Sequence, residues 1–255
     1  MSDSEEITSK SKNENKTKSN PLDDKYPTKR GFAGNFYNYF ALFLSLIFLN
    51  MKATGRENCP DSNKYIITSN HQSYIDGLYI ANFLPRGHFK HMCCLAASDL
   101  EDKHGWIGRV IMRVGRGIAV DRYGNPVRGL IKAKREVDKG NICLVFPEGS
   151  RTATGRLTPF KDGACYLAIK SNVPLVPTYV TGLYELWPRS KKYPQPFKGF
   201  LKRKKIRIVY GKPIYGKDFD NDPHKMTDYV YNWTLEMDNK YNDAEVLDKA
   251  LFKKK

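Results

Sequence analysis

The pattern of apolar and polar positions changes along the chain. Residues 1–30 are polar, rich in Ser, Lys, Asn and Glu, and without apolar periodicity, so we expect them to be disordered. Residues 36–49 are almost continuously apolar, and Asn38 and Ser45 are the breaks. From about residue 64, apolar runs of strand length alternate with helical patterns. The pattern divides the chain into four parts: a disordered polar tail over 1–30, a hydrophobic membrane-associating segment over 31–55, an α/β domain over 56–240 and a basic C-terminal tail over 241–255.

The hydrophobic segment fits two kinds of helix. Because it is apolar on nearly all sides, it could form a buried core helix or a helix that lies partly in lipid. A helix over 36–49 is shorter than the roughly 30 Å hydrocarbon core of a bilayer, so it is a marginal span. Aromatic residues crowd its start and basic residues flank it, as in interfacial anchors: Lys29, Arg30, Lys52 and Arg56. The segment therefore favours a membrane-associated protein over a secreted one, since no small-x-small cleavage site follows it.

The remaining sequence predicts an α/β fold with a mainly parallel central sheet flanked by helices. Residues 142–146 are continuously apolar, which indicates a strand buried on both faces. The other strands are expected at 65–68, 118–120, 175–180 and 206–210, and helices at 78–83, 125–140, 163–170 and 226–237. Polar clusters follow the strands. Because parallel strands bring their carboxyl ends to one edge, we expect ligand-binding groups to gather there.

Charge and cysteine content narrow the possible partners. The chain has 43 Lys and Arg against 27 Asp and Glu, a net charge of +16, which favours anionic partners such as acidic lipid or a phosphorylated substrate. Its five cysteines show no C-x-x-C and no zinc spacing with histidine, so we expect reduced thiols and no metal site. The basic stretch 189–207 contains no recognisable nucleic-acid motif, so no nucleic-acid partner is expected.

A histidine and an aspartate lie five positions apart in residues 70–76 (NHQSYID), directly after an apolar run. On an ideal helix the two would be roughly 140° apart, so His71 and Asp76 can meet only if the chain turns between them. Ser73 followed by Asp76 resembles a helix start, which predicts Ser73 as the N-cap residue.

Such a pair suits a general base, because Asp76 could orient one imidazole nitrogen while the other removes a proton from a substrate hydroxyl. The sequence contains no G-x-S-x-G elbow for a nucleophilic serine. Taken alone, the pair could equally be a structural capped turn. Arg122 and Arg151 strengthen the catalytic interpretation, since each follows an expected strand and guanidinium suits phosphate recognition. Either arginine singly fits a surface ion pair.

Four segments together resemble the glycerolipid acyltransferases, in order and approximate spacing: 70–76 (NHQSYID), 117–122 (GIAVDR), 146–151 (FPEGSR) and 173–177 (VPLVP). The chain looks like a 1-acylglycerol-3-phosphate acyltransferase over about residues 60–215. The resemblance implies transfer of a fatty acyl group from acyl-CoA or acyl carrier protein to the free hydroxyl of lysophosphatidic acid. The acyl thioester would be a co-substrate, and no cofactor is expected.

The resemblance also implies roles for individual residues. His71 would be the base and Asp76 its orienting partner, while Arg122 and Arg151 would bind the acceptor phosphate. Several neighbouring residues would shape the acceptor site: Asn70, Ser73, Glu148, Gly149 and Ser150. The family's hydrophobic front segment is set into one leaflet, which suits residues 36–49 and a catalytic domain on the cytoplasmic side of the membrane.

Two alternatives remain open at this point. The protein could acylate another acceptor, such as a different lysophospholipid or a lyso-amino-acid lipid, or act as a transacylase. It could also be a non-catalytic binder of anionic lipid or nucleic acid, with 189–207 as its working surface.

Overall fold

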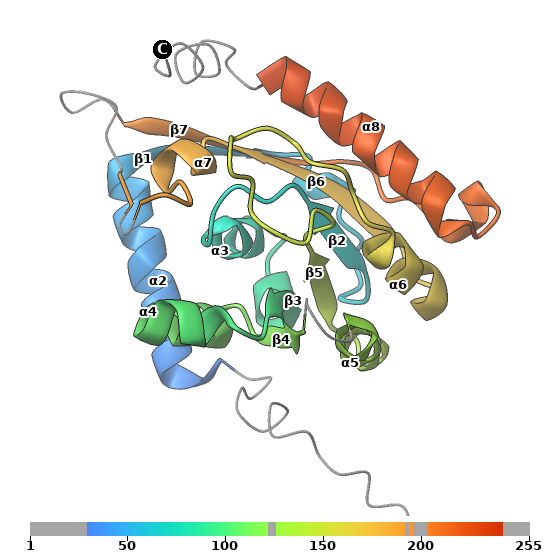
Figure 1. Ribbon diagram of the computed structural model, residues 1–255, viewed down its shortest axis with the longest axis horizontal. Coiled ribbons are helices and arrows are strands. Elements are labelled where there is room, and N and C mark those ends of the chain that lie inside the picture. The colour runs from blue at the N-terminus through green and yellow to red at the C-terminus, as the bar shows by residue number, and fades with distance from the viewer. Residues whose placement is uncertain (1–29, 122–125, 192–193, 196–202, 242–255) are drawn as a thin grey trace, which may run out of the picture.

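A seven-stranded sheet forms the centre of the computed structural model, which describes residues 30–121, 126–191, 194–195 and 203–241 (Figure 1). The order of the strands across the sheet is β1-β7-β6-β2-β5-β3-β4. Their bounds are β1 Leu49–Thr54, β2 Ile66–Ser69, β3 Met92–Ala97, β4 Gly117–Val120, β5 Ile142–Val145, β6 Leu175–Thr181 and β7 Lys204–Tyr210.

Five neighbouring strands run parallel to one another, from β6 through β2, β5 and β3 to β4. The sheet reverses once, where β7 pairs antiparallel with β6, and β1 then pairs parallel with β7. This arrangement confirms the predicted mainly parallel sheet. The carboxyl ends of β2 and β5 therefore lie side by side at one edge, with the sequence segments 70–76 and 146–151 directly beyond them.

Helices cover both faces of the sheet. Their bounds are α2 Gly31–Phe48, α3 Asp76–Asn82, α4 Leu100–Val114, α5 Pro126–Asp138, α6 Gly163–Ser171, α7 Leu183–Leu186 and α8 Pro223–Tyr241. In Figure 1, α2, α3 and α4 lie on one side of the sheet, whereas α5, α6 and α8 lie on the other. Asn125, the first residue of the helix expected over 125–140, lies outside the described residues.

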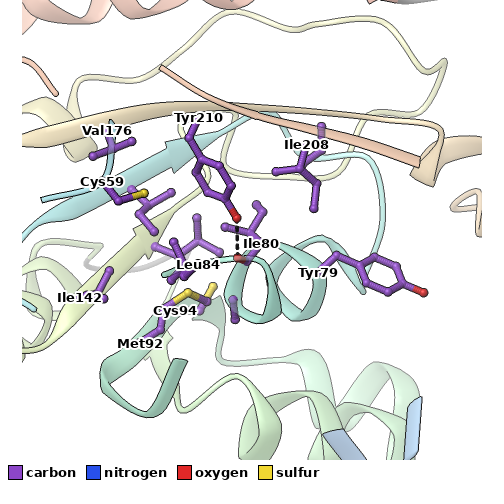
Figure 2. Packing of buried hydrophobic residues seen from close by; sticks show 14 of the residues in the cluster. Cys59, Tyr79, Ile80, Leu84, Met92, Cys94, Ile142, Val176, Ile208 and Tyr210 are labelled. Atoms are coloured by element: carbon purple, nitrogen blue, oxygen red, sulfur yellow. Dashed lines mark hydrogen bonds between the residues drawn. The ribbon is translucent and has the colours of Figure 1, made fainter. Parts of the chain in front are cut away.

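Two apolar clusters fill the spaces between the sheet and its helices. Successive residues of β2 point to opposite faces, so Ile67 belongs to the cluster beneath α3 and Ile66 to the cluster beneath α5, α6 and α8. Figure 2 shows how Tyr210 of β7 crosses the first cluster and donates a hydrogen bond of 2.7 Å to the Ile80 carbonyl on α3. This contact fixes α3, whose first residue is Asp76, against the sheet. All five cysteines are buried and unpaired in disulfides.

The hydrophobic segment 31–55 consists of two elements. Its first part is helix α2 and its second is the edge strand β1, in which Leu49 is buried and Met51 and Ala53 pack against the first cluster. Arg30, assigned by sequence to the polar tail, is instead buried. Its guanidinium donates to the carbonyl oxygens of Val114, Phe89 and Met92, so Arg30 packs with the α/β body.

Helix α2 turns Asn38 and Ser45 inward and most of its large apolar side chains outward. Asn38 is fully buried and exchanges two amide hydrogen bonds, of 3.1 and 2.9 Å, with Asn82 on α3. Ser45 is buried beside the Tyr79 hydroxyl at 2.7 Å. The large apolar residues are exposed: Phe32, Phe36, Tyr37, Tyr39, Phe40, Phe43, Leu44, Leu46, Ile47 and Phe48. The alternative of a buried core helix is therefore wrong, and the two sequence breaks are the docking contacts to α3.

Candidate active site

His71 follows β2 at the carboxyl edge of the parallel strands, and the chain turns between it and α3. The turn brings His71 Nδ1 to 2.8 Å from Asp76 Oδ2, which confirms the predicted bend. The Asp76 side chain is 0% exposed and the His71 side chain 18%, so the carboxylate is shielded from water while the imidazole remains accessible. Because an ionised carboxylate only accepts hydrogen bonds, Nδ1 carries the proton and Nε2 is left as the basic atom.

Asp76 also closes the turn that it shares with His71. Its oxygens accept backbone N–H groups from Gln72 at 2.6 Å and from Ser73 at 2.9 and 3.0 Å. The predicted N-cap is wrong: α3 begins at Asp76, its cap residue is Ile75, and the buried Ser73 hydroxyl has no hydrogen-bond partner among the described residues. The Asp76 carboxylate binds loop N–H groups ahead of the helix, and no side chain in the described part of the chain caps the first turn of α3.

The ring and the backbone of His71 are each held by the segment after β5. The imidazole stacks on Phe146 with ring centroids 3.8 Å apart and an interplanar angle of 13°. The His71 N–H donates to Glu148 Oε1 at 2.7 Å, and the His71 carbonyl accepts from the Thr152 N–H at 2.8 Å. These contacts restrict the imidazole to one plane and leave Nε2 as the atom that can face a substrate.

Glu148 binds protein donors through both of its oxygens. Oε2 accepts from the Thr158 hydroxyl at 2.6 Å and from the Thr158 N–H at 3.3 Å, while Oε1 accepts from His71. Burial raises the pKa of Glu148 above its ordinary range, and the bonds from Thr158 and His71 oppose that shift. Glu148 therefore links the loop at Thr158 to the backbone of His71.

Glu148→Gln is expected to become more stable relative to the wild type as the pH rises. Because the pKa of Glu148 is raised by burial, the folded protein binds this proton more tightly than the unfolded chain does. The wild type therefore loses unfolding free energy as the pH rises from the ordinary glutamate range through the raised pKa, whereas the variant has no proton to release here. Loss of the carboxylate acceptor adds an offset that does not depend on pH. Urea unfolding of both proteins across this window checks the trend, and a constant difference contradicts it.

Asn70 and Gln72, which flank His71, bind to strand β6 and to helix α7. Asn70 exchanges hydrogen bonds with the backbone of Val180 in β6, at 2.9 and 2.8 Å. Gln72 Oε1 accepts the N–H groups of Leu183 and Tyr184, which begin α7, at 3.1 and 3.2 Å. Both side chains are buried, so they hold the loop rather than face solvent.

The remaining predicted site residues lie in the segment after β5 or beyond β4. Arg151 stacks its guanidinium on the Tyr74 ring, 3.3 Å from the centroid. Gly149 has a left-handed φ of 72°, and an added Cβ would lie 3.3 Å from Lys161 Nζ, while Ser150 is exposed. Arg122 lies outside the described residues. Its neighbour Asp121 follows β4 at the same sheet edge, three strand spacings or about 14 Å from β2.

An accessible imidazole backed by a buried carboxylate, placed at the carboxyl ends of parallel strands in an α/β sheet, is an arrangement suited to general-base chemistry. A profile of the Acyltransferase family matches residues 50–181, more than half of the 255-residue chain and the region that carries this pair. The chain belongs to this acyltransferase family.

Individual relatives agree with this assignment. The chain is 29% identical over 214 residues to the 1-acyl-sn-glycerol-3-phosphate acyltransferase of Limnanthes douglasii, covering 80% of this chain and 69% of the relative. It is 31% identical over 170 residues to a chloroplastic enzyme of the same name from Brassica napus, covering 65% of this chain and 45% of that relative. Among solved structures, the 1-acyl-sn-glycerophosphate acyltransferase of Thermotoga maritima has the same fold, with a TM-score of 0.64 and 24% identity over 84% of this chain and 81% of that one.

Sequence reasoning missed several residues that hold the site. Gln72 and Thr152 bind through or to backbone groups, which leave no residue-type pattern, and the Thr158 hydroxyl reaches Glu148 only once the chain is folded. Phe146 was recognised only as part of a motif, although its place at the end of β5, the strand next to β2, puts it in reach of His71. Tyr74 lies within the 70–76 segment. An aromatic residue there could have been matched with Arg151, the arginine expected at the same sheet edge.

Proposed function

We propose that this protein transfers a fatty acyl group from an acyl thioester to the free hydroxyl of lysophosphatidic acid and so forms phosphatidic acid. The relatives' names support this acceptor. The observation that carries the chemistry is the 2.8 Å contact between His71 Nδ1 and the buried Asp76 carboxylate, which leaves Nε2 basic beside the sheet edge. Acyl-CoA and acyl carrier protein both supply the thioester that this reaction needs.

In the proposed mechanism, His71 Nε2 removes the proton from the acceptor hydroxyl as its oxygen attacks the thioester carbonyl carbon. The new C–O bond forms, and the tetrahedral intermediate then collapses and breaks the C–S bond. The departing thiolate takes the proton back from the imidazolium, which restores the base. Asp76 keeps Nδ1 protonated and stabilises the positive charge that the imidazole carries between the two steps. No covalent enzyme intermediate and no cofactor are required.

The proposed phosphate site contains Arg151 and Arg122. Arg151 lies on Tyr74, three residues after His71, so a phosphate bound there would place the rest of the acceptor near the base. The exposed apolar side of α2 lies in the cytoplasmic leaflet in this proposal, and the α/β domain faces the cytoplasm. The net charge of +16 favours contact with an anionic membrane surface.

An acyl-transfer assay with purified protein tests this function. Radiolabelled acyl-CoA and, separately, acyl carrier protein thioester are offered with four acceptors: lysophosphatidic acid, lysophosphatidylcholine, a lyso-amino-acid lipid and monoacylglycerol. We expect labelled phosphatidic acid as the main product. Transfer to one of the other lysolipids with none to lysophosphatidic acid would assign the chain to that acceptor instead, and absence of transfer to all four would refute an acyltransferase acting on these lipids.

A further inference from the structure

Tyr74 is held on several sides by other side chains at the candidate site. The Arg151 guanidinium covers one face of its ring, 3.3 Å from the centroid. The ring makes an edge contact with Trp187, with centroids 5.9 Å apart at 74°, and another with His104 of α4, at 4.7 Å and 68°. Its hydroxyl forms a hydrogen bond with His104 Nε2. Burial and the nearby Arg151 lower the pKa of His104, which favours its neutral ring. The unprotonated nitrogen of a neutral imidazole can accept a hydrogen bond from the Tyr74 hydroxyl.

Both partners of the Tyr74–Arg151 contact are tied to the backbone around His71. Tyr74 lies within the turn that Asp76 closes, because Asp76 accepts the N–H of Ser73. Arg151 precedes Thr152, whose N–H donates to the His71 carbonyl at 2.8 Å. The distance from the guanidinium to the base is therefore set by short backbone links rather than by the long arginine side chain alone.

Stacking on an aromatic ring suits a guanidinium that must bind a phosphate. The contact occupies one face of the planar group and uses none of the N–H donors that lie in its plane. It also fixes a side chain that otherwise samples many rotamers, so less freedom is lost when the anion binds.

We infer that Tyr74 is a positioning residue that holds the Arg151 guanidinium for the acceptor phosphate and thereby sets the preference for phosphorylated acceptors. This inference rests on the proposed function and deepens it. His104 and Trp187 hold the ring in turn, while the ring face is the part of Tyr74 that contacts the cation. The π face, not the hydroxyl, is therefore the group whose loss matters most.

Tyr74→Leu and Tyr74→Met remove the aromatic face and keep an apolar side chain, whereas Tyr74→Phe keeps the ring and loses the bond to His104. For the first two variants we expect KM for lysophosphatidic acid to rise about three- to thirtyfold, the range expected for losing a cation–π contact. The phosphate-free acceptor monoacylglycerol should show no comparable rise, and Tyr74→Phe should stay close to the wild type. Adding Tyr74→Leu to Arg151→Ala should cost little more than Arg151→Ala alone, because the two residues act as a unit.

Tyr229→Leu is the matched control, since Tyr229 is an aromatic residue of α8, 46% exposed, that contacts Phe219 instead of an arginine. Binding of sn-glycerol 3-phosphate, measured by calorimetry, gives a readout independent of turnover and should weaken in Tyr74→Leu. Suppose that the wild type turns over lysophosphatidic acid and that Tyr74→Leu and Tyr74→Met keep the wild-type KM and glycerol phosphate affinity. The inference about Tyr74 is then wrong, while the proposed function stands. An equal loss with both acceptors makes Tyr74 a purely structural residue, and a wild type inactive on lysophosphatidic acid refutes the proposed function first.

Discussion

His71→Ala is expected to lower kcat for acyl transfer by about a thousandfold, within the range of roughly 10²–10⁴ that a positioned general base contributes. The variant removes Nε2, the atom that accepts the hydroxyl proton in the proposed mechanism, and leaves the acceptor phosphate site unchanged. KM for lysophosphatidic acid should therefore change far less than kcat. Initial rates with labelled acyl-CoA, measured on protein whose circular dichroism and unfolding midpoint match the wild type, check this expectation.

The chain contains a second histidine–carboxylate contact that serves as a control. His224 on α8 lies 3.4 Å from Asp162, but its side chain is 74% exposed, against 18% for His71. Replacing His224 with alanine should leave the rate at the wild-type level. Wild-type activity in His71→Ala, or equal losses in both variants, would show that the imidazole of His71 is not the base.

The sequence allowed four of the five parallel strands to be predicted, because each of them has one dominant apolar pattern, whereas β3 was not among the expected strands. Residues 142–146 read as a doubly buried strand, and β5 is buried along its whole length between β2 and β3. β1 was missed, since its alternating Leu49, Met51 and Ala53 follow directly on the apolar helix and their pattern merges with it. Helix α4 was missed as well, and its non-helical Gly105 with φ 54° interrupts the periodicity that would have revealed it.

The candidate site was predictable where it depends on spacing and not where it depends on long-range contacts. The separation of five positions from His71 to Asp76 forbade a shared helical face, so a bend followed from geometry alone. The helix start could not be assigned in the same way, because the Ser73–Asp76 spacing fits a helix that begins directly after Ser73, whereas α3 begins only at Asp76. The bond from the His71 N–H to Glu148 joins residues 77 positions apart, so it emerges only once β2 and β5 are neighbours.

Helix α2 connects the proposed membrane contact to the turn that holds His71 and Asp76. Its inward amide and hydroxyl groups bind Asn82 and Tyr79, and both belong to α3, the helix that begins at Asp76. Its length and composition would allow it to cross a membrane, and only 17% of it is buried within the protein, unlike a core helix. A soluble surface helix normally shows the opposite distribution, with apolar residues turned inward. The exposed apolar face of α2 is therefore the part of the described chain best suited to contact lipid.

Replacing Phe36, Phe40, Phe43 and Ile47 of α2 with serine is expected to abolish stable binding to lipid vesicles. These four side chains are 47–60% exposed, and their partial transfer into lipid is worth roughly 4 kcal/mol together, about a thousandfold in partitioning. Sedimentation with vesicles containing anionic lipid measures the loss. The control places four serines at similarly exposed apolar residues of other helices, Val127, Ile131, Tyr166 and Tyr229, and should still bind. If the α2 variant binds vesicles as the control does, the membrane contact lies elsewhere in the chain. If binding is lost while activity on detergent-dispersed lysophosphatidic acid persists, α2 delivers the enzyme to its lipid acceptor and takes no part in the chemistry.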